Sequence, residues 1–442
     1  MLANTYKTIL SVALPLMVGT FIQSIVMISD AAILSRYSIT SFDASGNAGL
    51  IYITLFMGLS GLGDAGQIIM ARRIGEKNIS TLNSVIQSSI VFNLLMASLF
   101  FGLVYFVVPH LIDSIVIDAD IALEEKRFLS VRSFGFFVAA IFLSLNAFFL
   151  AIGKTWVILF STITFALSNI IFDYLFVFGI GPFPELGIEG ASLASVIGEF
   201  IAVLMMISII LFGRTARPYK LFKKLEVARY TILKLLKVGA PLMIQGFLAL
   251  ATWTVFFTWI EQLGRYELTV SQNLRSVYFL AFVPIFGFAA TTKTYVSQYL
   301  GSNNYKEIRS VIRKIQLLSL LFLLVTFHGA LLYPTSLISL INPAETYLME
   351  SGTVLRIVFG SILIYAFMAP YFQTINGSGN TRITLIIEIV AIIIYLGCAY
   401  LFIKVFGWEI AEIWTVEYIY FVSLGVFSLF YLRFFNWRKK LF

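Results

Sequence analysis

The chain has 442 residues, of which 59% are apolar and only 12% are charged. A soluble domain usually carries about 25% charged residues, so this composition excludes an ordinary water-soluble fold. The net charge of +8 would suit a nucleic-acid-binding protein, but the basic residues gather in loops between apolar runs. Membrane topology and anionic lipid explain that placement, so we expect no nucleic-acid partner.

Many apolar runs are long enough to cross a hydrocarbon core roughly 30 Å thick. They are continuous rather than alternating, which predicts helices and excludes a barrel. We therefore predict an all-α polytopic protein surrounded by membrane lipid. Its twelve transmembrane helices are expected at roughly 9–35, 45–70, 84–109, 128–152, 155–178, 188–212, 232–260, 270–298, 310–334, 354–376, 381–405 and 412–434.

The loops alternate in charge along the chain. One side of the membrane receives the basic loops and the tail, including the cluster between Arg214 and Lys237, and the other side receives acidic loops such as the one from Asp113 to Glu125. By the positive-inside rule, both termini should lie in the cytoplasm. We expect a multi-pass protein of the bacterial cytoplasmic (inner) membrane.

The sequence repeats itself at one constant offset. A shift of 226 positions superimposes Pro15-Leu16-Met17 on Pro241-Leu242-Met243, and it also superimposes Gly75 on Gly301, Asn78 on Asn304 and Gly153 on Gly379. Two copies with six spans each share one orientation, which predicts lobes at 1–212 and 232–442 joined by a basic linker at 213–231. Such pairs rock against each other to give alternating access. The alternative is a duplication without moving parts, as in some channels.

Ionisable residues inside the predicted spans need a partner or a function, because a charge at that depth is costly. They are Asp30, Asp64, Asp173, Glu199, Lys293, Glu388 and Glu417. A carboxyl group removed from water favours its neutral form, so it can exchange a proton, or it can bind Na⁺ with help from neutral oxygens. Either reaction would couple transport to an ion gradient.

All of these residues except Glu388 also have a structural explanation. Asp30 and Lys293 could reach the membrane interface, and Lys293 or Asp173 could instead belong to a buried ion pair. Asp64 follows the Gly-rich stretch 58–63, where it could cap or break a helix. Glu199 and Glu417 fall in equivalent spans of the two halves, which suggests a shared structural role.

Two sets of polar residues share helix faces. Asn169 and Asp173 are four residues apart in the fifth span, and Ala191, Ser195 and Glu199 follow the same spacing in the sixth. An amide oxygen beside a carboxylate suits a small cation. In contrast, one cysteine and two distant histidines offer no transition-metal site, and no HExxH or GxSxG motif indicates an enzyme.

Several segments together resemble the multidrug and toxic compound extrusion (MATE) family over nearly the whole chain. Residues 169–176 resemble its N-x-x-x-D-x-x-F signature, and 187–195 resemble its G-x-x-G-A-A-x-A-T stretch. The segments 13–16, 75–78, 239–241 and 377–381 resemble further family motifs, and Asp30 occupies the acidic position of the first span. No single motif is decisive, but their order and spacing together are specific.

The resemblance implies a cation site in the first lobe, formed by Asp30, Asn169, Asp173 and Ser195 with the carbonyl of Ala191. Ser195 stands where the family has threonine, and it keeps the hydroxyl. The resemblance also implies a monomer that needs no cofactor beyond H⁺ or Na⁺ as the coupling ion.

The family has two bacterial branches that differ in their second lobe. The NorM-like branch has acids in the seventh and tenth spans, whereas 245–249 and 357–376 hold none here. The DinF-like pattern, with coupling confined to the first lobe, is therefore expected. Glu388 is the residue that could substitute in the second lobe.

We accordingly expect a secondary active antiporter, not an enzyme, that exports small organic, amphipathic cationic compounds (multidrug or xenobiotic efflux) in exchange for H⁺ or Na⁺. The alternative is a lipid-linked oligosaccharide flippase of the same superfamily. Such flippases line their cavity with basic residues, whereas the intramembrane charges here are mostly acidic.

Overall fold

The computed structural model describes residues 1–438, and this range is helical with no β-strand. Within residues 1–438, eleven helices are long and apolar enough to cross a membrane. The bent pair α5 (Ala119–Arg132) and α6 (Gly135–Ala151), with an angle of 46° between its halves, makes a twelfth span. The prediction of an all-α fold with twelve transmembrane helices is confirmed.

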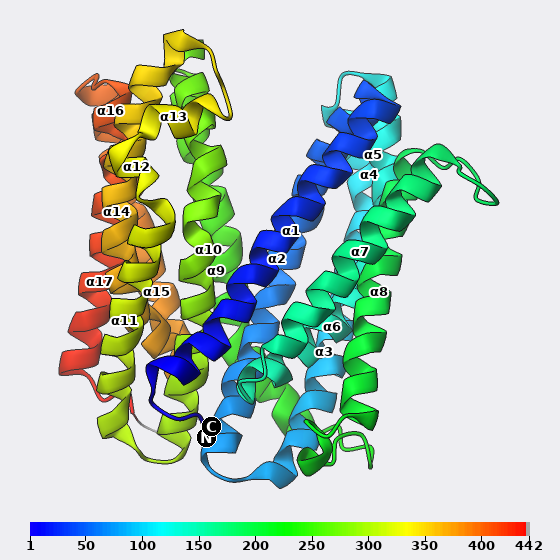
Figure 1. Cartoon of the computed structure of the whole chain (residues 1–442), viewed down its shortest axis with the longest axis vertical. Coiled ribbons are helices and arrows are strands. Elements are labelled where there is room, and N and C mark those ends of the chain that lie inside the picture. The colour runs from blue at the N-terminus through cyan, green and yellow to red at the C-terminus, as the bar shows by residue number, and fades with distance from the viewer. Residues whose placement is uncertain (439–442) are drawn as a thin grey trace. The chain divides into compact units, whose positions relative to one another are not determined.

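The described chain forms two compact units (Figure 1). The N-terminal unit is Val18–Gly246, and the C-terminal unit joins Met1–Met17 to the residues from Phe247 onward. The N-terminal unit contains most of α1 (Tyr6–Tyr37), then α2 (Ile39–Gly75), α3 (Leu82–Gly102), α4 (Val108–Ile115), α5, α6, α7 (Trp156–Phe178), α8 (Ile188–Phe212) and the first half of α9 (Arg229–Glu261).

The C-terminal unit contains the rest of α9 and the helices that follow it. These are α10 (Arg265–Gly301), α11 (Tyr305–Phe327), α12 (Gly329–Leu332), α13 (Pro334–Ser339), α14 (Glu345–Ser378), α15 (Thr381–Tyr400), α16 (Ile410–Ile413) and α17 (Val416–Phe434). The divisions between the units fall inside α1 and α9, a few residues after the repeated prolines Pro15 and Pro241.

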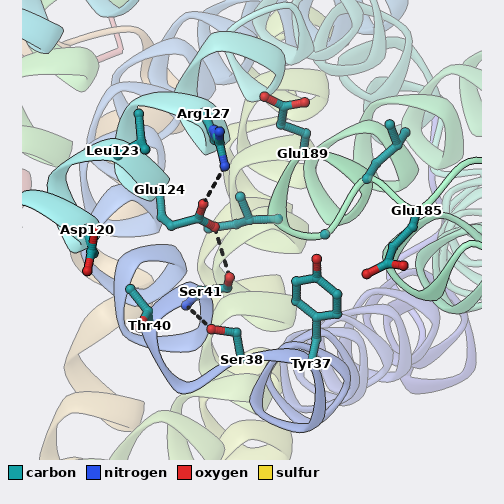
Figure 2. A pocket seen from close by; sticks show the side chains of 13 residues that line it. Tyr37, Ser38, Thr40, Ser41, Asp120, Leu123, Glu124, Arg127, Glu185 and Glu189 are labelled. Atoms are coloured by element: carbon teal, nitrogen blue, oxygen red, sulfur yellow. Dashed lines mark hydrogen bonds and ion pairs between the residues drawn. The ribbon is translucent and has the colours of Figure 1, made fainter.

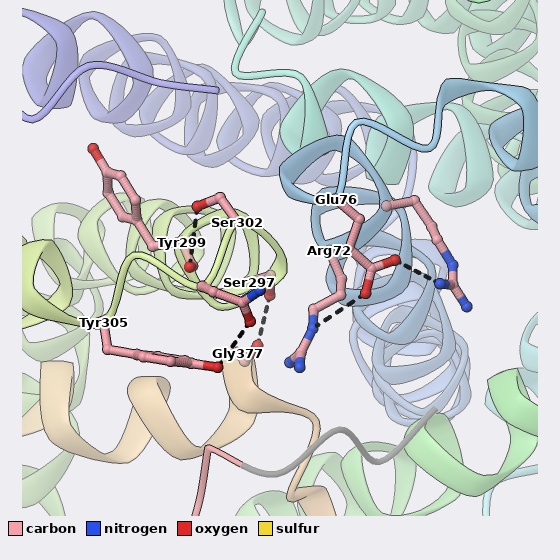
Figure 3. Close-up of polar contacts among 9 residues, drawn as sticks. Arg72, Glu76, Ser297, Tyr299, Ser302, Tyr305 and Gly377 are labelled. Atoms are coloured by element: carbon pink, nitrogen blue, oxygen red, sulfur yellow. Dashed lines mark hydrogen bonds and ion pairs between the residues drawn. The ribbon is translucent and has the colours of Figure 1, made fainter.

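The sequence repeat reappears in the backbone at equivalent turns. Lys77 and Asn303, 226 positions apart, both adopt left-handed conformations, with φ of 59° and 57°. Gly153 and Gly379 do the same after α6 and α14, with φ of 70° and 88°. In the second copy, the hydroxyl of Tyr305 donates to Oδ1 of Asn303 at 2.9 Å and holds the turn (Figure 3). The repeat therefore preserves turn geometry as well as residue identity.

The fourth span differs from its prediction at 128–152. It begins earlier, because the side chain of Asp118 caps α5 by accepting hydrogen bonds from the backbone of Asp120 (2.9 Å) and Ile121 (3.2 Å). The chain then bends between Arg132 and Gly135. This bend directs Arg132 toward the interior of the N-terminal unit, where it contacts Glu199.

In the C-terminal unit, α10 and α14 pack closely against each other. The hydroxyl of Ser297 donates to the carbonyl oxygen of Gly377 at 2.6 Å (Figure 3). A Cβ atom on Gly377 would lie 2.9 Å from the carbonyl oxygen of Lys293, so only glycine fits at this contact. Small residues allow such close approach between membrane helices.

Glycines bring α7 and α8 together in the N-terminal unit, where the two helices lie side by side (Figure 1). A Cβ atom on Gly190 would lie 2.7 Å from the carbonyl carbon of Phe176. One on Gly198 would lie 3.2 Å from the backbone nitrogen of Asn169. This close packing sets the distance between the polar residues that the two helices carry.

We predict that Gly190→Ala lowers the stability of the protein by about 1–3 kcal/mol, because the added methyl group meets backbone atoms that cannot yield easily. The thermal unfolding midpoint in detergent should fall. The matched control is Gly102→Ala, where a Cβ atom would meet no other heavy atom within 4 Å. Equal midpoints for the two variants would show that α7 and α8 are not packed as described.

Candidate cation-coupling site

Four of the residues predicted to form a cation site lie on three helices of the N-terminal unit. Asp30 comes from α1, Asn169 and Asp173 from α7, and Ser195 from α8. The side-chain amide of Asn169 donates to the hydroxyl of Ser195 at 3.1 Å, which joins α7 to α8. The carboxyl groups of Asp30 and Asp173 are close enough to interact directly.

The acceptor atoms at this site have unused hydrogen-bonding capacity. Asp173 and Asn169 are fully buried. Among the described residues, no N–H or hydroxyl group donates to either carboxyl oxygen of Asp173, to Oδ1 of Asp30 or to Oδ1 of Asn169. Four buried oxygens from three side chains therefore lack a donor. Buried acceptors without partners are costly, so their clustering suits a bound proton or cation.

An apolar layer lies one helical turn from these polar residues. It is a cluster of buried side chains made by Leu34, Ala44, Val177, Ile188 and Ala191. Leu34 follows Asp30 by four residues and Val177 follows Asp173 by four, while Ala191 precedes Ser195 by four. Ala191, predicted as a carbonyl ligand, thus contributes its side chain to this layer. The layer separates the carboxyl pair from the end of the unit where α1 ends and α8 begins.

A cavity of about 840 Å³ lies at that end of the N-terminal unit (Figure 2). Ile188 belongs to both the cavity wall and the apolar layer. The charged residues of the wall are Asp120, Glu124, Glu185, Glu189 and Arg127. Four carboxylates against one guanidinium give this cavity a negative field, which favours cations.

One charged residue beside the site, Arg132, is not among the predicted site residues. Arg132 donates from Nη2 to Oε1 of Glu199 at 2.6 Å, and its guanidinium carbon lies 4.0 Å from the centre of the Tyr52 ring. It also interacts electrostatically with Asp30. The signal was available, because Arg132 falls inside the predicted span 128–152 just as the acids fall inside theirs. Glu199, predicted only as an additional intramembrane charge, is the ion-pair partner.

Two other predicted charges belong to the C-terminal unit, where tyrosines surround them. Glu417 accepts hydrogen bonds from the hydroxyls of Tyr278 (2.9 Å) and Tyr395 (3.1 Å). Glu388 accepts one from the hydroxyl of Tyr420 at 2.6 Å. Both glutamates are buried. Each of them accepts a hydrogen bond from at least one tyrosine hydroxyl, whereas three oxygens of the Asp30–Asp173 pair accept none from the described residues.

The remaining two predicted charges lie elsewhere. Lys293 is buried in α10 of the C-terminal unit. Asp64 lies in α2, which continues without interruption through the Gly-rich stretch, so the alternative that Asp64 breaks a helix is wrong. Within residues 1–438, no group of three or more His, Cys, Asp or Glu side chains is arranged to hold a metal ion.

The chain matches the sequence model of the MatE family over residues 15–175 and 226–401, and it belongs to that family of membrane transporters. It is 24% identical over 445 residues to a probable multidrug resistance protein NorM of Thermotoga maritima, a match that covers 98% of this chain and 93% of the relative. A protein of the same name in Listeria monocytogenes serotype 4b is 24% identical over 81% of this chain and 82% of its own length.

Solved structures share the fold at low sequence identity. The outward-facing conformation of a multidrug resistance MATE family transporter of the MOP superfamily has a TM-score of 0.87 at 17% identity, covering 97% of this chain and 95% of that one. A MOP superfamily transporter from Pyrococcus furiosus, described as having a binding pocket of reversed polarity, has a TM-score of 0.86 at 18% identity, covering 98% and 97%. These likenesses establish two lobes of six transmembrane helices.

We predict that Glu417→Leu destabilises the C-terminal unit, because two buried tyrosine hydroxyls then lose their acceptor, at about 1–3 kcal/mol for each unsatisfied group. Glu417→Gln keeps an acceptor oxygen and should cost less. Thermal unfolding midpoints in detergent compare the two. A Glu417→Leu protein as stable as the wild type would contradict the hydrogen-bonded arrangement.

Proposed function

We propose that this transporter is a secondary active antiporter that exports organic, amphipathic cationic compounds in exchange for H⁺ or Na⁺ by alternating access. The observation that carries the proposal is the carboxyl pair Asp30 and Asp173, three of whose four oxygens are buried without a donor among the described residues. The relatives named probable multidrug resistance proteins support a role in multidrug efflux.

The coupling follows from the electrostatics of the pair. Two carboxylates at close range in a low-dielectric interior repel each other, and a proton or cation relieves that repulsion. Asn169 and Ser195 add an amide and a hydroxyl at the same place, and their own hydrogen bond fixes α7 against α8. Occupancy of the site by an ion therefore changes the charge buried between α1, α7 and α8.

A change in buried charge can drive a conformational change only if the two conformations bind the ion with different affinity. We propose that ion entry favours the conformation that releases substrate outward. The apolar layer of Leu34, Val177 and Ile188 lies between the carboxyl pair and the acidic cavity, so it would open to admit the ion.

The acidic cavity also favours cationic substrates over anionic ones. Its volume of about 840 Å³ lies in the range of roughly 300–1,000 Å³ that holds drug-sized molecules. A lipid-linked oligosaccharide carries a diphosphate, which this negative field would repel. We therefore favour an organic cation over the flippase alternative.

The position of the buried acids also bears on which lobe couples transport to the ion. We place coupling in the N-terminal lobe, the DinF-like pattern, because the spans around 245–249 and 357–376 hold no acid and because tyrosine hydroxyls occupy Glu388 and Glu417. We also propose that the protein works as a monomer in the bacterial inner membrane with both termini in the cytoplasm.

We predict that Asp173→Asn reduces gradient-driven efflux of ethidium, a flat organic cation, from proteoliposomes to the level of protein-free liposomes. The amide has nearly the shape of the carboxyl group but can neither bind a proton nor carry a charge. Efflux is followed by fluorescence under an imposed H⁺ or Na⁺ gradient.

The matched control is Asp113→Asn, which removes a carboxylate that is 57% exposed and pairs with Lys126 on the surface. This variant should transport as the wild type does. Wild-type efflux by Asp173→Asn would remove Asp173 from the coupling mechanism. Absence of efflux in the folded wild type under both gradients would contradict the proposed function.

A further inference from the structure

Arg132 lies between two acidic groups in the N-terminal unit. Its ion pair with Glu199 has an N–O distance of 2.6 Å, and both side chains are largely buried, at 12% and 18% exposure. Its guanidinium also covers the ring of Tyr52 and interacts electrostatically with Asp30. A permanent positive charge therefore acts on Asp30, one member of the carboxyl pair.

The fold makes room for this guanidinium. Gly135, the first residue of α6, follows directly after the bend that ends α5. A Cβ atom on Gly135 would lie 2.6 Å from Nη1 of Arg132 and 2.9 Å from the hydroxyl of Tyr52. Any other residue at 135 would displace one of the two groups. The bend and the absence of a side chain at Gly135 together leave space for the guanidinium of Arg132.

Arg132 does not use all of its donors. A guanidinium offers five N–H groups. Its Nη1 atom is buried without a partner among the described residues, and so are Oε2 of Glu199 and the hydroxyl of Tyr52. Oδ1 of Asp30 is likewise without a donor. Because Nη1 of Arg132 and Oδ1 of Asp30 are both unpartnered, each of these two side chains can still form a further hydrogen bond.

We propose that Arg132 is a tethered counter-ion for the carboxyl pair and that it makes the coupling site selective for H⁺ over Na⁺. This inference rests on the proposed function and names its coupling ion. When the pair loses its proton, Asp30 and Asp173 are both carboxylates, and the guanidinium of Arg132 stabilises the added negative charge through its interaction with Asp30. When the pair binds a proton, one of the two carboxylates becomes a neutral carboxylic acid, and Arg132 remains paired with Glu199.

Sodium would fare worse than a proton at the same place. A proton needs a single carboxyl oxygen, whereas a metal cation needs several oxygens around it. The guanidinium offers only N–H donors and repels any cation at close range. Lys would place a compact charge here without the planar fork, so Arg132→Lys should retain selectivity only in part.

The charged and titratable groups that face the site are Asp30, Asp173, Glu199, Arg132 and Tyr52. Removing the positive charge of Arg132 should make proton binding by the pair tighter, because a charge that favoured the ionised form is gone. Removing the charge of Glu199 frees Arg132 to act on Asp30, so proton binding should become weaker. The two neutral variants are therefore expected to act in opposite directions.

The test is the pH profile of H⁺-driven ethidium efflux in proteoliposomes. Arg132→Gln should shift the midpoint upward by about one pH unit, a tenfold change in proton concentration, and Glu199→Gln should shift it downward. Lys126→Gln, which removes a partly exposed positive charge from the same helix, is the control and should leave the midpoint in place. Equal shifts of the two variants in one direction would overturn the proposal, since a purely structural pair would fail in the same way from either side.

A second measurement does not depend on transport. The unfolding midpoint of the detergent-solubilised protein is compared in NaCl and in choline chloride at constant ionic strength. The wild type should show no difference, and Arg132→Gln should gain a Na⁺-specific stabilisation. If Arg132→Gln alone does not fold, the double variant Arg132→Gln/Glu199→Gln, which neutralises both members of the ion pair, takes its place.

Specific stabilisation of the wild type by Na⁺ would overturn the role given to Arg132. This result is distinguishable from a failure of the proposed function. Absence of ethidium efflux from the wild type under any gradient would contradict the exporter function, whereas the Na⁺ comparison still reports whether the site admits the metal ion.

Discussion

The interior of the N-terminal unit holds two carboxyl groups whose negative charge no described partner fully compensates, and the proposed coupling depends on this imbalance. Asp30 and Asp173 bring two carboxyl groups together inside the unit, and no N–H or hydroxyl of the described residues donates to three of their oxygens. Arg132, the positive charge that interacts with Asp30, forms its ion pair with Glu199 and not with the carboxyl pair. The interior of a membrane protein offers little water to compensate such a pair. An ion that enters and leaves can supply the missing charge, and this is why we place coupling here.

The packing of the unit keeps the imbalance in place. Gly190 and Gly198 bring α8 close to α7, so Asn169 and Ser195 form their hydrogen bond beside Asp173. One turn away, the apolar layer separates these residues from the acidic cavity. In the C-terminal unit, by contrast, tyrosine hydroxyls donate hydrogen bonds to the buried glutamates Glu388 and Glu417. The buried acids of the two units therefore differ in whether hydroxyl groups compensate their charge.

The sequence predicted the fold well, because long apolar runs and a repeat of turn residues are local signals. It also indicated Asn169 and Asp173 as neighbours through their spacing on one helix. It could not indicate that Arg132 pairs with Glu199, since those residues are 67 positions apart and meet only through the bend before Gly135. Tertiary contacts between distant charges leave no periodic pattern, so an ion pair of this kind becomes visible only in the structure.

The carboxyl pair of Asp30 and Asp173 is proposed to exchange protons in step with the binding and release of substrate. The most direct measurement is the release of protons when ethidium binds to the detergent-solubilised protein in weakly buffered solution, followed with a pH indicator. The account predicts proton release from the wild type and none from Asp173→Asn. Equal release from both proteins, or ethidium binding to the wild type without any release, would contradict it.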